Sequence, residues 1–258
     1  MRSFAVGSLV VAVAAVAVLV SREQDFQHRR TSAQLVVLAA SSLRGPMSKI
    51  ADDYRLRTGT ELILIYGASE DLLARARLPD AGDPPDLFLP ADESYIADAA
   101  RHGLIGRSEP IATMRATMLL APGCRVESWN DLLRCHGVSL ANDAAAIGRM
   151  TRQHLQRSGR WTAFEPIIRG AANVSDSANA AKIGAVEAAI VWEPVARLHP
   201  TLIARPIDEL DGIVAIVRAA TLNGSKRSRE AEEFLKYLAD ADGGKPRFRE
   251  AHFRPVTP

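Results

Sequence analysis

The stretch "LAASSLRGPMSKI", residues 38–50, places two adjacent serines between a strand-forming run and a helical pattern. The preceding run, "QLVVLAA", predicts a buried strand, and the segment 43–57 predicts a helix that ends at Gly59. The apolar residues of that helix have the i, i+3, i+4, i+7 spacing of one buried stripe: Met47, Ile50, Ala51 and Tyr54. The serines therefore stand where a strand ends and a helix begins.

A hydroxyl at such a corner lies beside the unpaired N–H groups of the first helical turn. These donors and the helix dipole together favour an anion. Ser42 could instead cap the helix that begins near Pro46, which is the simpler interpretation for a single serine.

The same arrangement recurs twice in the chain. In "YGAS", residues 66–69, Ser69 would cap a helix at 69–77, and in "LPAD", residues 89–92, Asp92 would cap a helix at 92–102. Because the carboxyl ends of parallel strands open on one edge of a sheet, all three corners should face the same crevice. Three convergent corners predict a site for one small anion.

Short apolar runs alternate with amphipathic segments from Gln34 onward, which is typical of a parallel sheet covered on both faces. A second series starts at "RATMLLAPG" and predicts strands at "VSLA" and "AAIVW", with helices near 129–134, 148–158 and 176–183. The run "GIVAIVRAA" adds a strand and the tail adds two helices. We expect two α/β lobes with a cleft between them.

The composition limits the kind of ligand. The 258 residues are 47% hydrophobic, enough for a sizeable core, and the formal net charge is +2. No run of five like charges could form a stripe for nucleic acid, so we expect no nucleic-acid partner. Arg149 and Arg152 are expected on a solvated helix face, and Trp129 and Trp161 are expected to pack in the lobe.

The N-terminal segment contains an uninterrupted apolar run, Phe4–Val20, that would be about 25 Å long as a helix. This length lies between the core of a signal peptide and a minimal membrane span, and Ala15 and Ala17 offer a weak cleavage signal. Cleavage and retention as a membrane anchor both remain open, and both export the rest of the chain.

The two cysteines, Cys124 and Cys135, lie close in sequence. In an oxidising compartment they could form a disulfide, and the alternative is two unpaired thiols. His136 is adjacent, but the chain has no CxxC or HxxxH motif that would indicate a metal site.

The chain resembles the molybdate-binding proteins of ATP-driven import systems in the order and spacing of five segments: "LAASSL", "YGASEDLLARA", "DLFLPADESYIADAARHGLI", "AAIVWEPVA" and "FREAHFRPV". The resemblance implies an α/β, two-lobed type II periplasmic-binding-protein fold, each lobe a mainly parallel sheet flanked by helices, joined by two crossover strands. The expected divisions are 1–32 as signal peptide or N-terminal anchor with a polar linker, 33–115 with 207–258 as lobe 1, and 116–206 as lobe 2.

The resemblance also implies an oxyanion held between the lobes by neutral hydroxyls and backbone N–H groups. Carried over by position, the ligand-binding residues are Ser42, Ser69, Ala91, Ile147, Val174 and Trp192. Ser42, Ser69 and Val174 would approach the metal only through the oxyanion, without direct ligation. Trp192 stands where the family commonly has a tyrosine, and an indole N–H donates but cannot accept.

A site that favours phosphate needs a buried acceptor for the proton that phosphate carries, and Glu193, the residue after Trp192, is the obvious candidate. Because side chains alternate along a strand, Glu193 should point away from the cleft if Trp192 points into it. Its carboxylate would then meet solvent or an arginine.

The resemblance predicts an exported monomer that captures molybdate or tungstate and delivers it to the permease and ATPase subunits of an ABC importer. The expected location is the periplasm or the outer face of the cytoplasmic membrane, and no cofactor is expected. The alternative is a binding protein or tethered sensor for sulfate or phosphate. An enzyme with Ser42 or Ser69 as nucleophile is disfavoured, because neither serine lies in G-x-S-x-G and no histidine accompanies a triad motif.

Overall fold

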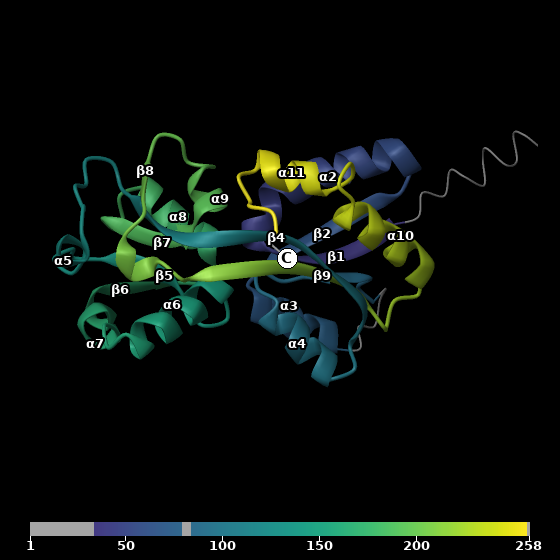
Figure 1. The fold of residues 1–258 in the computed structure, drawn as a ribbon, viewed down its shortest axis with the longest axis horizontal. Helices are drawn as coiled ribbons and strands as arrows, with labels where there is room; N and C mark the ends of the chain where they lie inside the picture. The colour runs from purple at the N-terminus through teal and green to yellow at the C-terminus, as the bar shows by residue number, and fades with distance from the viewer. Residues whose placement is uncertain (1–33, 79–83, 257–258) are drawn as a thin grey trace, which may run out of the picture.

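The predicted strands and helices assemble into two lobes that lie side by side along the long axis of the molecule (Figure 1). The structure is a computed structural model and describes residues 34–78 and 84–256. The predicted signal peptide or anchor at 1–32 lies outside these residues. Within them, no helix has the length and apolar character needed to cross a membrane.

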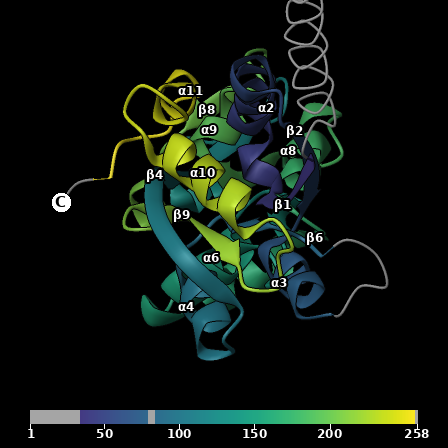
Figure 2. The same ribbon diagram turned by 90° about the vertical axis from the view of Figure 1, so that its right-hand side faces the viewer.

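The sheet of the first lobe has the order β2-β1-β3-β9-β4. Its strands are β1 (Gln34–Ala40), β2 (Glu61–Gly67), β3 (Leu87–Leu89), β9 (Val214–Leu222) and the first part of β4 (Ile105–Leu120). The first three are parallel, and β9 runs antiparallel to β3 and β4. The helices are α2 (Arg44–Thr58), α3 (Ser69–Arg77), α4 (Ser94–Arg101), α10 (Ser228–Ala239) and α11 (Lys245–Glu250). Helices α2 and α11 lie on one side of the sheet, and α3 and α4 on the other (Figure 2).

The sheet of the second lobe has the order β4-β7-β5-β6, and β8 also pairs with β4. Its own strands are β5 (Val138–Ala141), β6 (Ile168–Ala171), β7 (Ala188–Trp192) and β8 (Ile203–Arg205). The helices are α5 (Trp129–Leu132), α6 (Ala146–Arg157), α7 (Trp161–Phe164), α8 (Val174–Lys182) and α9 (Glu193–Ala196). Trp129 and Trp161 pack against Phe164, with ring centroids 5.3 and 6.1 Å apart, which confirms their predicted packing role. Helix α7 and strand β8 are too short to have given a periodic pattern in the sequence.

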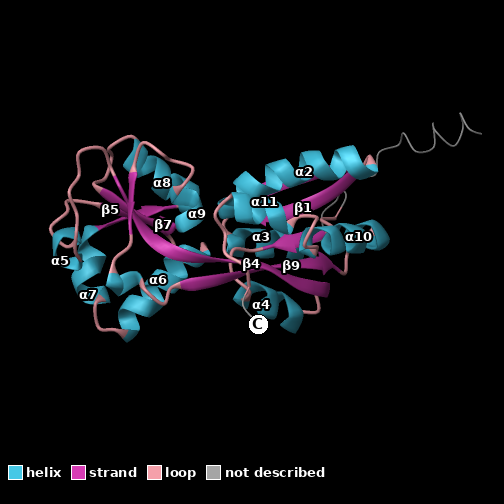
Figure 3. Ribbon diagram, turned by 45° about the horizontal axis from the view of Figure 1, so that its top comes forward, coloured by secondary structure: helices cyan, strands magenta, loops and turns pink. Residues whose placement is uncertain are grey.

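One long strand belongs to both sheets. Strand β4 pairs with β9 as far as Arg115 and with β7 from Ala116 onward, so a single ladder passes from one lobe to the other. Strand β9 is the second connection between the lobes (Figure 3). The prediction placed this strand only from "RATMLLAPG" onward, but it begins ten residues earlier, at Ile105. We propose that the division between the lobes follows the change of partner at Arg115 and Ala116.

The first helix agrees with its predicted stripe. Met47, Ile50 and Tyr54 are buried and Ala51 is partly buried. Gly59 ends the helix with φ of 78°, a left-handed conformation that glycine adopts without steric cost.

A buried ion pair fixes the first lobe near the start of β3. Asp86 is fully buried and accepts the N–H of Val36 at 2.8 Å and the hydroxyl of Ser225 at 2.6 Å. The guanidinium of Arg227, just before α10, lies 3.2 Å from the same carboxylate. One side chain therefore joins the sheet to the start of a helix that lies far away in sequence.

Asp86→Ala should lower the free energy of unfolding by about 3–5 kcal/mol, because it leaves a buried guanidinium contact and a strand N–H without their acceptor. Urea denaturation provides the measurement. The control is Glu233→Ala, which removes an exposed i,i+4 pair with Arg229 and should change stability by at most about 0.5 kcal/mol. Equal effects of the two substitutions would contradict this role of Asp86.

The cysteines are both free thiols in the structure, so the disulfide alternative is not the one observed. Cys135 is buried, and its Sγ lies 3.8 Å from the carbonyl oxygen of Asp131. Burial raises the pKa of Cys135 to about 11 and also raises the pKa of Cys124. Both groups therefore stay protonated and poorly reactive near neutral pH.

At pH 8 the native protein should be alkylated at Cys135 about 100-fold more slowly than a free cysteine, since the thiolate is the reactive form. The rate should rise with pH until the pKa of Cys135 is passed. In urea without reductant, mass spectrometry should show both thiols alkylated at the ordinary rate. Two unmodified cysteines in that denatured sample would show a disulfide instead.

Candidate anion-binding site

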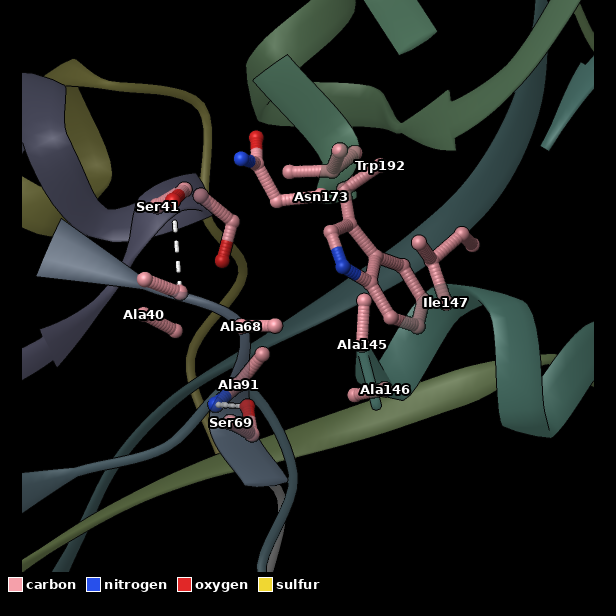
Figure 4. Close-up of a pocket in the computed structure, with 13 residues that line it drawn as sticks. Ala40, Ser41, Ala68, Ser69, Ala91, Ala145, Ala146, Ile147, Asn173 and Trp192 are labelled. Carbon is pink, nitrogen blue, oxygen red and sulfur yellow. Dashed lines mark hydrogen bonds between the residues drawn. The ribbon is translucent and has the colours of Figure 1, made fainter. Parts of the chain in front are cut away.

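Six strand ends and the segments that follow them meet at the boundary between the lobes. From the first lobe come the ends of β1, β2 and β3, and from the second lobe come the ends of β5, β6 and β7. The described residues that line the resulting cavity are Ala40, Ser41, Ser42, Gly67, Ala68, Ser69, Ala91, Ala145, Ala146, Ile147, Asn173, Val174 and Trp192. The structure thus brings all six sequence-predicted site residues together, and Figure 4 shows most of this set.

None of the described residues that line the cavity is charged. Most of them are small, so the backbone of each corner approaches the centre closely. The cavity volume is about 10 Å³, which is room for about one water molecule. The lobes are therefore closed on each other around this cavity.

Ser42 supplies an unused hydroxyl at this cavity. The side chain is buried, at 3% exposure, and its Oγ has no hydrogen-bond partner among the described residues. The simpler interpretation, that Ser42 caps the following helix, is wrong: a 3-10 turn, Ser41–Leu43, comes first, and the N-cap of α2 is Leu43. An unpaired buried hydroxyl costs about 1–3 kcal/mol, so the site favours a ligand that accepts a hydrogen bond from it.

Ser69 also differs from the predicted cap. It is the first residue of α3, with Ala68 at the N-cap, and its Oγ accepts the backbone N–H of Ala91 at 3.1 Å (Figure 4). The N–H of Ala91 is therefore engaged with Ser69 in this structure. A hydroxyl that accepts one hydrogen bond still has its own proton to donate. Ser69 can therefore donate to a ligand, and the bond from Ala91 strengthens that donation.

Asp92 caps as the sequence predicted, but it lies outside the cavity. Its Oδ1 accepts the N–H of Ser94, the first residue of α4, at 3.1 Å, although the N-cap position itself is Glu93. The third predicted corner therefore contributes Ala91 to the cavity lining, and the carboxylate of Asp92 does not line the cavity.

The second lobe contributes two helix N-termini. Asn173 caps α8 by accepting the N–H groups of Ser175 and Asp176, at 2.9 and 3.2 Å, and both Asn173 and Val174 line the cavity. The sequence analysis missed Asn173, although an asparagine before a helical pattern is a recognisable cap signal.

Gly148 is a second residue that the sequence analysis missed. It lies in the first turn of α6, beside Ile147, and a Cβ there would lie 2.0 Å from the carbonyl oxygen of Ala141. Only glycine allows α6 to start against the end of β5, where its first two residues, Ala146 and Ile147, line the cavity. In the sequence Gly148 was the first residue of the helix predicted near 148–158, whereas the helix begins two residues earlier, at Ala146.

Trp192 closes the cavity from the end of β7. The side chain is 1% exposed, and its ring nitrogen lies on the edge that faces the first lobe (Figure 4). Glu193 points elsewhere: its carboxylate accepts two bonds from Nη2 of Arg254, at 2.9 and 3.1 Å. Glu193 therefore meets an arginine as predicted, but the reason differs: β7 ends at Trp192 and Glu193 begins α9, so the two residues do not alternate along one strand.

Two α/β lobes that share crossing strands and enclose a donor-lined cavity at their strand ends define a type II periplasmic-binding-protein fold, and solved structures of this class share it. The chain belongs to the bacterial extracellular solute-binding protein family, whose model matches residues 35–254.

The comparisons with individual proteins are more distant. The molybdate-binding protein ModA of Escherichia coli (strain K12) is 26% identical over 154 residues, which is 55% of this chain and only 58% of that protein. The periplasmic molybdate-binding protein of Azotobacter vinelandii has a TM-score of 0.69 at 18% identity, over 87% of this chain and 99% of that one. The sulfate-binding protein SubI of Mycobacterium tuberculosis H37Rv has a TM-score of 0.70 at 17% identity, over 88% of each chain. At these identities the structures show the fold, and the ligand is left to the chemistry of the cavity.

Gly148→Ala should destabilise the protein by about 1–3 kcal/mol, because the added Cβ overlaps a backbone oxygen. Without that overlap, glycine to alanine within a helix would stabilise by up to about 1 kcal/mol, so the sign of the change is the test. Urea denaturation and titration with oxyanions should show lower stability and weaker binding together. Gly170→Ala, where a Cβ meets nothing within 4 Å, is the control and should change neither.

Proposed function

We propose that this protein captures molybdate or tungstate in the cavity between its lobes and delivers it to an ABC importer. The observation that carries the proposal is the hydroxyl of Ser42, which is buried and unpaired at a cavity lined by no charged side chain. Neutral donors in this arrangement suit a ligand that carries full negative charge and only accepts hydrogen bonds.

Helix dipoles add to this preference. Helices α3, α6 and α8 all begin at the cavity lining, and each N-terminus carries a partial positive charge of about half a unit. Several such termini can stabilise a dianion without an arginine or lysine in contact with it.

Phosphate fits this lining less well than the other tetrahedral ions. Near neutral pH much of it carries a proton, which needs a buried acceptor. The acceptor expected from the sequence, Glu193, is bound to Arg254. Sulfate is the second candidate ligand, since it is a proton-free dianion and the fold is similar to that of a sulfate-binding protein. We expect size to separate the proton-free dianions, because sulfate has shorter bonds than molybdate or tungstate and would make stretched contacts to at least one lobe.

The family supports an exported protein, and we place this one in the periplasm or on the outer face of the cytoplasmic membrane. Its proposed partners are the permease and ATPase subunits of the importer, which would recognise the closed, loaded form. We propose a monomer that performs no covalent chemistry, in accord with the family.

Calorimetric titration should rank molybdate and tungstate first, sulfate well behind, and phosphate without detectable binding. Ser42→Ala should weaken molybdate binding about 10- to 150-fold, which corresponds to about 1.5–3 kcal/mol for a hydrogen bond to a charged group. Ser48→Ala removes an exposed hydroxyl that is bonded to a carbonyl of its own helix, and should leave the affinity unchanged.

Full molybdate affinity in Ser42→Ala would remove the site assignment. Tight phosphate binding that disappears in Glu193→Gln would instead move the protein to the phosphate alternative. Sulfate binding as tight as molybdate binding would favour the sulfate alternative.

A further inference from the structure

The two lobes are also joined by a set of polar contacts beside the cavity. The carbonyl oxygen of Ala144, just before α6, accepts the N–H of Glu70 at 2.9 Å and the hydroxyl of Tyr95 at 3.3 Å. Both donors belong to the first lobe. Ser69, which precedes Glu70, and Ala145, which follows Ala144, line the cavity. These contacts can exist only while the lobes are closed.

Arg149 extends this set from the next turn of α6. Its Nη2 lies 3.4 Å from Oδ1 of Asp92 and donates to the hydroxyl of Ser94, and its guanidinium carbon lies 3.9 Å from the centroid of the Tyr95 ring. The side chain is only 27% exposed, so the expectation of a solvated face is wrong for Arg149. The physical reason is that α6 faces α4 of the other lobe at this point, which the sequence of α6 alone does not show.

The charge of Asp92 gives this contact a consequence for the ligand. Asp92 follows directly after Ala91, a residue of the cavity lining, and its side chain is only 12% exposed. An unpaired carboxylate so close to the cavity would repel an anion, and low exposure reduces the screening by solvent. Arg149 supplies the opposite charge from the other lobe at the moment of closure.

We propose that Arg149 is a positioning residue that holds the two walls of the anion site together and neutralises Asp92 beside it. This inference rests on the proposed function for its effect on anion affinity, but its effect on lobe closure does not require any ligand. Tyr95 supports the arrangement, since burial raises its pKa to about 12 and keeps its hydroxyl a donor to Ala144.

Arg152 provides a matched control on the same helix. It pairs with Asp143 and Glu165 and stacks over Trp161, with 4.3 Å from its guanidinium carbon to the ring centroid. All three partners belong to the second lobe. Arg152→Gln therefore removes the same charge and a similar ring contact without touching the cleft.

The experiment measures lobe separation and molybdate affinity in the full chain, with one fluorophore on each lobe for the distance. In anion-free Arg149→Gln the distance distribution should move to larger separations, and molybdate should bind at least about 10-fold more weakly, because the binding-competent population is smaller. Adding Asp92→Asn should recover part of that affinity, since the unpaired carboxylate is removed. Arg152→Gln should match the wild type in both measurements.

An anion-free lobe separation that is the same in Arg149→Gln and the wild type would overturn the inference, whatever the ligand is. So would a double variant that binds no more tightly than Arg149→Gln. If the wild type binds no molybdate but the separation changes as expected, the proposed ligand fails while the positioning role of Arg149 stands.

Discussion

The backbone ladder of β4 is the constraint on which the two-lobed arrangement depends. Its first part is hydrogen-bonded to β9 and its last five residues to β7, without a break in the chain between the two sheets. The strand cannot leave either sheet without losing its ladder hydrogen bonds. The lobes therefore stay joined along β4, and they can move apart only by bending where β4 passes from one sheet to the other. The strand ends of both lobes consequently face one another across a narrow gap.

What fills that gap follows from the rule that buried polar groups need partners. Ser69 and Ala91 satisfy each other, and Asn173 satisfies two donors of α8. Ser42 is left over, together with donors at the helix starts, and water or an accepting ligand must complete them. The same lining offers no side-chain carboxylate, so completion favours an ion that brings only acceptors.

Local patterns were sufficient to predict most of this arrangement, and the exceptions share one cause. The buried stripe of α2 follows from the period of 3.6 residues, and the left-handed Gly59 follows from the preference for glycine at a helix end. Both are properties of a single element. The cap alternative for Ser42 and the cap prediction for Ser69 both fail, because a 3-10 turn precedes α2 and Ser69 bonds a partner 22 residues away. The solvated position predicted for Arg149 was wrong because its partners lie in the other lobe. The sequence of α6 alone does not show which residues of the other lobe face it.

The contacts that cross the cleft determine why a ligand can control closure. The pair of Arg254 with Glu193 is partly exposed and contributes at most about 1 kcal/mol, and the pair of Arg149 with Asp92 is less exposed and less screened. When the lobes separate, each one keeps its own sheet and its own apolar core. Opening therefore costs far less free energy than unfolding. Closure is therefore held by a few weak bonds, and charge-assisted hydrogen bonds from both lobes to one anion are strong enough to decide between the open and closed forms.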